Sequence, residues 1–235
     1  LSIGKRDHGL SHIESTYRVP EAVWDKPQMV IATIELSPGF TRDGLAFLFV
    51  RGDGLYRSDD HGTSWNKVST GVLDDSSTTD PRGLYTLKYL HIGFSPAFST
   101  DGTLYIAGPQ GLYRSTDRGL SWHTIATESL GEQPNILAFG ISPDFANDRT
   151  LVTSVKGKGL YRSTDGGEQF RGIGQSLIDD NQSIDLVGFS GDFARDHTLY
   201  AASDQTVFKS VDSGDNWIAL DRPVRYEDRR DAITY

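Results

Sequence analysis

The sequence predicts an all-β fold, a β-propeller built from four-stranded blades. Two observations lead to this fold class. Two short motifs recur together, in one register, along most of the 235 residues. Each repeat also contains four short runs of apolar residues, separated by glycine, aspartate, asparagine and serine. Four short strands in a repeating unit of about 40–50 residues are typical of a propeller blade.

The first recurring motif is Ser-x-Asp-x-Gly followed by an aromatic residue. Its aspartates stand at positions 60, 117, 165 and 212, so the intervals are 57, 48 and 47 residues. The second motif reads Ser-Pro-x-Phe in its best copies. It begins at serines 37, 95, 142 and 190, with intervals of 58, 47 and 48 residues. Two independent motifs that share one spacing indicate four complete copies of one structural unit.

The elements of one repeat can be followed in order in the third copy. A first run at 135–142 (NILAFGIS) is followed by the second motif, expected as a turn, and by a second run at 150–155 (TLVTSV). A tight turn (KGKG) leads to a third run at 160–163 (LYRS), and the first motif joins it to a fourth at 168–173 (EQFRGI). These runs are rich in β-branched and aromatic residues and none keeps a helical period, so they predict strands. The first run is the most continuously apolar, which places it nearest the central axis.

The repeats predict a single propeller domain over residues 1–235. Complete blades are expected at about 29–70, 84–127, 135–175 and 183–220. A degenerate copy of the first motif at 5–12 (KRDHGLSH) indicates a partial blade at 1–20, and the run DAITY indicates the start of a further blade at 231–235. The predicted propeller is therefore five-bladed, with the two ends sharing a blade, or it is part of a larger propeller.

The first motif is predicted to be structural, at the turn between the third and fourth strands. Its glycine permits a positive φ, and its serine and aspartate can bond the amides of the turn itself. The aromatic residue begins the fourth strand and packs between blades. An active site needs one such constellation, whereas this one recurs in every blade. The predicted structural residues are Asp7, Ser58, Asp60, Gly62, Trp65, Ser115, Asp117, Gly119, Trp122, Ser163, Asp165, Gly167, Phe170, Ser210, Asp212, Gly214 and Trp217.

The motif Ser-x-Asp-x-Gly-x-x-Trp resembles the Asp-box, also called the bacterial neuraminidase repeat. The copies at Ser58, Ser115 and Ser210 are close to the full pattern, whereas Phe170 replaces the tryptophan in the third copy. Asp-box propellers include sialidases, xyloglucan-cleaving glycoside hydrolases, sortilin-type receptors and photosystem II assembly factors. The resemblance covers essentially the whole chain. It implies the propeller fold and leaves the function open, because one fold hosts many functions.

The composition argues against several classes of function. A formal net charge of −9 argues against nucleic acid and anionic lipid as main partners. The absence of cysteine removes disulfides, thiol nucleophiles and cysteine-ligated metals. The apolar runs are far shorter than the roughly 18 residues needed to cross a membrane, so no membrane insertion is expected. No cofactor or metal is predicted, because the six histidines lack ligand spacing and the run DDSSTTD matches no EF-hand loop.

Binding is expected on the face that carries the irregular loops. The loops between successive blades are long and variable, and they share this face with the loops between second and third strands. The opposite face holds the repeated turns. Variable loops on a regular scaffold are where binding usually evolves. The candidate binding residues on this face are Arg18, Trp24, Asp74, Asp75, Asp80, Arg82, Lys156, Lys158, Asp179 and Asp180.

These features favour a non-catalytic binding or scaffolding module for a protein or carbohydrate ligand, in an extracellular or periplasmic location. A role as a subunit of a larger assembly is consistent with this interpretation. The alternative is a sialidase-like or xyloglucanase-like glycoside hydrolase, or part of one, with two loop carboxylates about 5–10 Å apart. The stretch TYRVP at 16–20 resembles the Arg-Ile-Pro motif of sialidases, but it falls in a predicted loop rather than on a central strand.

One further pattern concerns the third strands. Arg57, Arg114 and Arg162, with Lys209, recur at the same position of each third run. Because they recur in every blade, we expect them to pair with carboxylates of neighbouring strands rather than to bind an anionic ligand.

Overall fold

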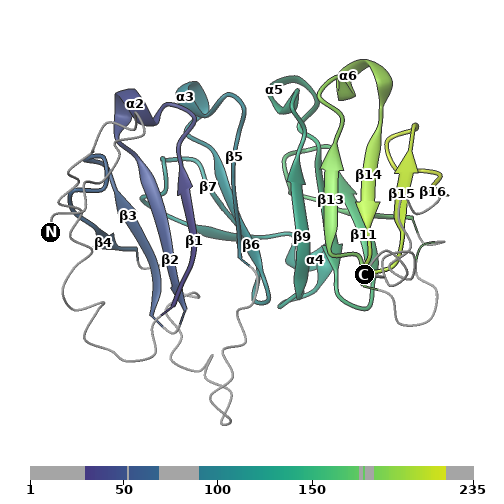
Figure 1. Ribbon diagram of the computed structural model, residues 1–235, viewed down its shortest axis with the longest axis horizontal. Helices are drawn as coiled ribbons and strands as arrows, with labels where there is room; N and C mark the ends of the chain where they lie inside the picture. Colours follow the sequence, from purple (N-terminus) through teal and green to yellow (C-terminus); the bar gives the residue numbers. More distant parts are fainter. Residues whose placement is uncertain (1–29, 52, 69–89, 175–176, 178–182, 221–235) are drawn as a thin grey trace, which may run out of the picture.

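The computed structural model describes residues 30–51, 53–68, 90–174, 177 and 183–220, and it contains four β-sheets of four antiparallel strands (Figure 1). The strands of each sheet follow one another in chain order, so each sheet is a meander. The predicted all-β class with four-stranded units is confirmed.

Sheet 1 consists of β1 (Val30–Leu36), β2 (Ala46–Arg51), β3 (Gly54–Ser58) and β4 (Asn66–Lys67). Sheet 2 consists of β5 (His91–Phe94), β6 (Leu104–Gly108), β7 (Gly111–Ser115) and β8 (His123–Ile125). Sheet 3 consists of β9 (Ile136–Ile141), β10 (Leu151–Val155), β11 (Gly159–Ser163) and β12 (Arg171–Ile173). Sheet 4 consists of β13 (Leu186–Phe189), β14 (Leu199–Ala202), β15 (Val207–Ser210) and β16 (Ile218–Leu220).

The second motif forms a one-turn helix in every repeat, where the sequence predicted only a turn. These helices are α2 (Phe40–Asp43), α3 (Phe98–Asp101), α5 (Phe145–Asp148) and α6 (Phe193–Asp196). In the second repeat, Ser95 Oγ accepts the amide of Ala97 at 3.1 Å and donates to Asp101 at 2.7 Å, which closes the turn on itself. Four residues are too few to display a period of 3.6, so a sequence pattern cannot reveal such a helix. A fifth short helix, α4 (Thr127–Leu130), follows β8.

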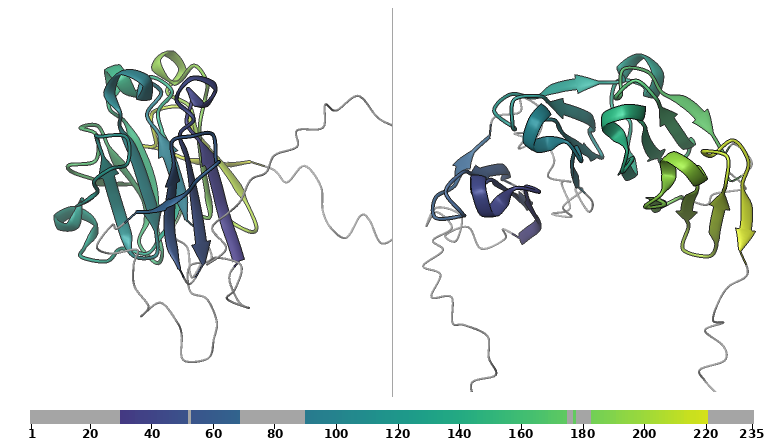
Figure 2. Two further views of the ribbon diagram at one scale, coloured as in Figure 1. Left: turned by 90° about the vertical axis from the view of Figure 1, so that its left-hand side faces the viewer. Right: turned by 90° about the horizontal axis from the view of Figure 1, so that it is seen from above.

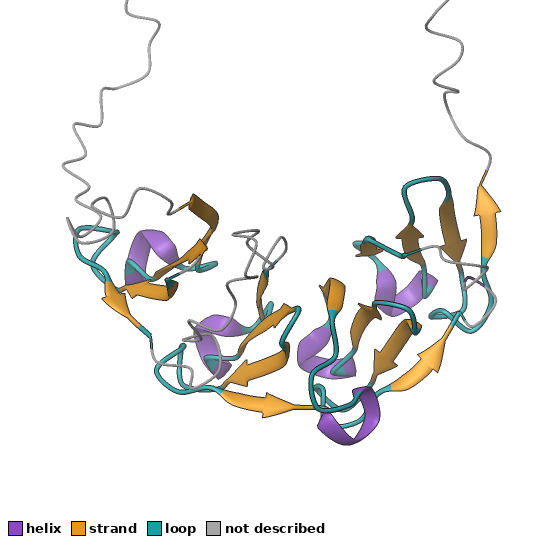
Figure 3. Ribbon diagram, turned by 90° about the horizontal axis from the view of Figure 1, so that it is seen from below, coloured by secondary structure: helices purple, strands orange, loops and turns teal. Residues whose placement is uncertain are grey.

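The four sheets stand side by side along an open arc (Figure 2). The first strands lie on the concave side of this arc and the fourth strands on the convex side, as the sequence colours of Figure 2 (right) show, and Figure 3 shows the same arc from below. Contacts run from β5 to β9 and from β9 to β13. The helices α2, α3, α5 and α6 all lie at one edge of the sheets, together with the turns between third and fourth strands (Figure 1). We call this edge the turn edge.

The core lies between neighbouring sheets. Sheets 1 and 2 enclose one cluster, in which Phe47 of β2 meets Trp122 edge to face at a centroid distance of 6.2 Å. Sheets 2 and 3 enclose a second cluster that contains Tyr105 and Phe145, and sheets 3 and 4 enclose a third that contains Phe193. Since each sheet is buried by its neighbours, an interior sheet depends on both sides for its stability.

The last described sheet has one face that no described residue covers. Tyr105 in sheet 2 and Tyr200 in sheet 4 occupy the same register position. Each pairs with a glycine of the first strand and with a basic residue of the third strand. Tyr105 is 0% exposed, and its hydroxyl donates to the carbonyl of Gly166 in sheet 3 at 2.9 Å. Tyr200 is 41% exposed. The face of sheet 4 that carries Tyr200 is therefore equivalent to the face of sheet 2 that packs against sheet 3.

Candidate functional site

Each Ser-x-Asp-x-Gly turn uses its polar groups on its own backbone. Ser115 Oγ accepts the amide of Gly119 at 2.8 Å and donates to Asp117 at 2.8 Å. The Asp117 carboxylate accepts the amides of Leu120 and Ser121 at 3.0 and 2.9 Å. The same serine-to-glycine bond measures 2.9, 2.8 and 2.8 Å in the turns that begin at Ser58, Ser163 and Ser210. This arrangement suits a structural element, because little hydrogen-bonding capacity is left for a ligand.

These hydrogen bonds hold the turn carboxylates in the ionised form. Bonds from the Ser64 hydroxyl and amide lower the pKa of Asp60 from its ordinary 3.8 to about 2. The amide and side chain of Asn216 lower the pKa of Asp212 to about 2 as well. For Asp117 partial burial acts to raise the pKa, but the hydrogen bonds within the turn outweigh it and the pKa is again about 2.

The turn carboxylates are therefore expected to make the stability depend on pH below about pH 4. The unfolded chain protonates them near pH 4 and the folded chain only near pH 2, so the unfolded state binds more protons between these values. Their stabilising contribution is full above about pH 4 and is lost as the pH falls toward 2. Urea denaturation across this range measures the slope. Asp117→Asn should flatten the slope relative to Asp59→Asn, whose carboxylate pairs with Arg57 at the surface. Equal slopes for the two variants would contradict this role.

The third-strand arginines link each sheet to the next. Arg57 Nε donates to the carbonyl of Arg118 at 3.2 Å, and Arg114 Nη1 donates to the carbonyl of Gly166 at 3.3 Å. Arg162 Nη1 donates in the same way to the carbonyl of Ser213. In each case the acceptor is the residue before the motif glycine, in the turn of the following sheet.

The expectation that these arginines pair with carboxylates of neighbouring strands is therefore only partly right. Arg114 does pair with Glu168 at 2.6 Å and Arg162 with Asp215 at 3.5 Å, but both carboxylates belong to the turn of the next sheet. The shared acceptor is a main-chain carbonyl. A sequence pattern cannot identify it, because strand and turn meet only when two sheets pack.

A groove of about 330 Å³ crosses the concave side over the first strands of sheets 1 to 3. It is lined by Glu35 of β1, by His91 and Phe94 of β5, and by Phe139 and Ile141 of β9, among others. These strands lie on the inside of the arc (Figure 2, right). The groove thus brings together residues from three repeats, and it combines aromatic and apolar side chains with a single carboxyl group.

Packing within and between the sheets determines the environment of several groove residues. Burial raises the pKa of the Glu35 carboxyl above its ordinary 4.5. A ring nitrogen of His91, Nε2, lies 3.0 Å from the carbonyl of Leu137 on the next sheet. Phe94 packs edge to face on Phe98 at 4.8 Å, which fixes the orientation of its ring. The groove therefore has a defined shape without a ligand.

The structure describes two of the ten loop-face residues proposed from the sequence. Lys158, in the turn between β10 and β11, donates its Nζ to the carbonyl of Leu130 at 3.0 Å, and Lys156 in the same turn is exposed. The remaining eight lie outside the described residues: Arg18, Trp24, Asp74, Asp75, Asp80, Arg82, Asp179 and Asp180. Asp7 of the degenerate motif copy also lies outside them.

Reasoning from the sequence missed the concave groove. Its residues stand in the apolar first runs, where a sequence pattern indicates only core. One signal was present, since Glu35 is an acidic residue inside the first run of its repeat. Within the described ranges, no group of three histidine, aspartate or glutamate side chains is arranged to hold a metal ion. Among the same residues, no helix is long and apolar enough to span a bilayer.

The chain is similar in sequence to bacterial xyloglucanases. It is 31% identical over 94 residues to the xyloglucanase Xgh74A of Acetivibrio thermocellus, a match that covers 36% of this chain and 11% of that enzyme. The chain thus spans about a tenth of the length of this relative. No protein-family model matches.

Solved structures share the fold. An ancestral GH74 enzyme superposes with a TM-score of 0.58 at 19% identity, over 83% of this chain and 24% of that chain. YCF48 bound to the D1 peptide gives 0.52 at 14% identity, over 83% and 55%. PorZ, a bacterial surface component of the type-IX secretion system of Porphyromonas gingivalis, gives 0.53 at 13% identity, over 80% and 22%. At these identities the likeness establishes the β-propeller fold, on which both glycoside hydrolases and peptide-binding proteins are built.

Proposed function

We propose that this chain is a non-catalytic binding module whose concave groove holds an extended polysaccharide. The observation that carries the proposal is the lining of the groove, which includes the aromatic residues Phe94 and Phe139 and a single carboxyl group, that of Glu35. Aromatic rings at the wall of a groove offer flat apolar surfaces to sugar rings, and a few polar groups then fix the orientation.

The sequence likeness to xyloglucanases supports a glucan as the class of ligand. The single carboxyl group argues against hydrolysis, since a glycosidase needs two carboxyl groups about 5–10 Å apart. Among the described residues that line the groove, Glu35 is the only acidic one. The ten loop-face residues, the Asp-box resemblance, a location outside the cytoplasm and a place in a larger assembly remain parts of this proposal.

A glycoside hydrolase is the second candidate. Two observations favour it: the likeness to the xyloglucanase Xgh74A, and the raised pKa of Glu35, which suits a general acid. In this case the second carboxylate would come from the loop-face residues, for example Asp74, Asp75 or Asp80.

Xyloglucan polymer distinguishes the two candidates. We expect it to retard the protein in affinity gel electrophoresis without any release of reducing ends. Phe139→Ala should weaken the retardation about tenfold, a loss of about 1.4 kcal/mol. Phe189→Ala is the matched control, because Phe189 is also a half-buried phenylalanine of a first strand but does not line the groove.

Other outcomes have a definite meaning. Release of reducing ends that Glu35→Gln abolishes would establish the hydrolase and overturn the non-catalytic assignment. If xyloglucan does not retard the protein at all, the glucan ligand is wrong. The melting transition of each variant is measured in parallel, so that loss of binding is separated from loss of fold.

A further inference from the structure

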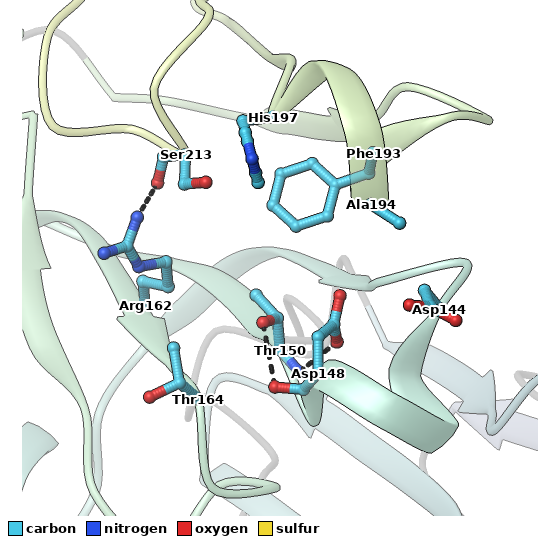
Figure 4. A pocket seen from close by; sticks show the side chains of 9 residues that line it. All are labelled: Asp144, Asp148, Thr150, Arg162, Thr164, Phe193, Ala194, His197 and Ser213. Carbon is cyan, nitrogen blue, oxygen red and sulfur yellow. Dashed lines mark hydrogen bonds between the residues drawn. The ribbon is translucent and has the colours of Figure 1, made fainter.

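A second hollow, of about 310 Å³, lies at the turn edge between sheets 3 and 4. Figure 4 shows its walls: Asp148 of α5 and Arg162 of β11 on one side, Phe193 and His197 of the α6 segment and Ser213 of the following turn on the other. It lies at the edge of the sheets, apart from the first-strand groove, and shares no residue with that groove.

The equivalent position between sheets 1 and 2 is filled by a side chain of the protein itself. Arg118 reaches from the turn of sheet 2 to the Asp43 carboxylate of α2, where Nη2 lies 2.7 Å from Oδ2. Its guanidinium lies over the ring of Phe98, 4.9 Å from the centroid. A carboxylate and an aromatic face thus hold one guanidinium between the two sheets.

The repeat places the same two partners between sheets 3 and 4, but without the arginine. Asp148 ends α5 as Asp43 ends α2, and Phe193 begins α6 as Phe98 begins α3. The position of Arg118 is taken by Ser213, which has nearly the same backbone φ, 59° against 63°. The hollow is therefore the arginine site of the first interface with its arginine replaced by a serine.

Between sheets 2 and 3, a guanidinium also lies over a phenylalanine ring. Gly166 occupies the position of Arg118, and Arg149, from the end of α5, lies over Phe145 at 5.6 Å instead. Between sheets 3 and 4 the position of Arg149 is held by His197, whose ring meets Phe193 edge to face at 6.1 Å. Neither arginine is present at this interface.

The wall of the hollow also contains an unpartnered donor, in a residue whose equivalent at the first interface is satisfied. Arg162 is only 9% exposed, and its Nε has no hydrogen-bond partner among the described residues. At the first interface the equivalent Nε of Arg57 does have one, the carbonyl of Arg118. Arg162 uses Nη1 for the equivalent carbonyl of Ser213, so its buried Nε is left unsatisfied at this interface.

We propose that this hollow binds the side chain of an arginine presented by a peptide or protein partner. The guanidinium pairs with the Asp148 carboxylate and lies on the ring of Phe193, as that of Arg118 does on Asp43 and Phe98. The formal net charge of −9 favours the approach of a cationic partner. The site is separate from the groove assigned to the polysaccharide, so either proposal can fail without the other.

The test titrates the folded, isotope-labelled protein with the peptide acetyl-Gly-Arg-Gly-amide and follows the amide signals of Asp148 and Ser213 by NMR. The same peptide with citrulline, which has nearly the same shape but no charge, should bind at least tenfold more weakly. Asp148→Asn should weaken the arginine peptide at least fivefold. Asp101→Asn is the matched control, because Asp101 makes the same bonds to a serine hydroxyl and a threonine amide but lies outside the hollow.

Ser213→Arg provides a second measurement that needs no ligand. It should abolish peptide binding and raise the melting temperature by about 2–4 °C, because it restores the contacts of the first interface. Ser213→Met should not raise the melting temperature. Equal binding of the arginine and citrulline peptides, or binding that Asp148→Asn leaves unchanged, would overturn the proposal, as would a Ser213→Arg variant that still binds the peptide.

Discussion

Gly119→Ala is expected to lower the free energy of unfolding by about 3–5 kcal/mol, from backbone strain and overpacking together. Gly119 lies in the turn of sheet 2 with φ +82°, a conformation that L-residues rarely adopt. A Cβ at this position would overlap Cζ of Phe47, on sheet 1, and stand 2.7 Å from its Cε1. Phe47 is fully buried, and its ring packs against Phe94 and Trp122, so moving it aside disturbs the core. The ring of Phe47 or the backbone of the turn would have to shift, and urea denaturation measures the loss.

Gly157→Ala separates the two causes. Gly157 also has a positive φ, of +72°, but a Cβ added there meets no described atom within 4 Å. We expect only the backbone strain, about 1–2 kcal/mol. If contact with Phe47 causes the difference, Phe47→Leu should reduce the effect of Gly119→Ala by about 1 kcal/mol or more. Equal losses for the two glycine variants would show that the crowding contributes nothing.

Phe98→Ala is expected to cost about 3–5 kcal/mol, the range for removing a fully buried aromatic side chain. Phe98 begins α3, is 0% exposed and belongs to the core between sheets 1 and 2. Its ring packs on Phe94 at 4.8 Å and carries the guanidinium of Arg118. The substitution would leave a cavity and remove the surface on which that arginine rests. Chemical denaturation measures the loss.

Phe40→Ala is the matched control for this variant. Phe40 begins α2 at the same position of its repeat as Phe98 in the next, but it lies on the first described sheet and is only partly buried. Its ring contact is with His61, at 5.2 Å. We expect a loss of about 1 kcal/mol, in the range of an exposed aromatic pair. A loss as large as that of Phe98→Ala would mean that the repeat position, and not burial between sheets, sets the cost.

The fold was predictable because it repeats. Four copies of two motifs located the turns, and the apolar runs between them located the strands. The helix at each second motif was missed, since the bonds from Ser95 to the backbone and to Asp101 act within seven residues and leave no periodic pattern. Local hydrogen bonds of this kind decide between a turn and a helical turn.

Neither hollow was predictable from the sequence. The groove depends on the curvature of the arc, which brings Glu35, His91 and Phe139 together from three repeats. The hollow at the turn edge depends on a side chain that is missing. The substitution of Ser213 for Arg118 is visible when the repeats are aligned, but it acquires a meaning only once Asp43 is known to lie across the interface.

The bonds from the third-strand arginines to the turn carbonyls all run in one direction along the arc. In each of these three bonds the donor lies in the earlier sheet and the acceptor in the later one, so each interface is heterologous and joins two different faces. On the face of sheet 4 that carries Tyr200, Lys209 takes the place of the arginines and lies over the ring of Tyr200 at 5.9 Å. If this face of sheet 4 met the same face of a second copy, two Lys209 side chains would lie opposite each other. Neither would find the turn carbonyl that accepts a hydrogen bond from the equivalent arginine at the other interfaces. The uncovered face of the last described sheet therefore differs in its chemistry from the faces that join the described sheets.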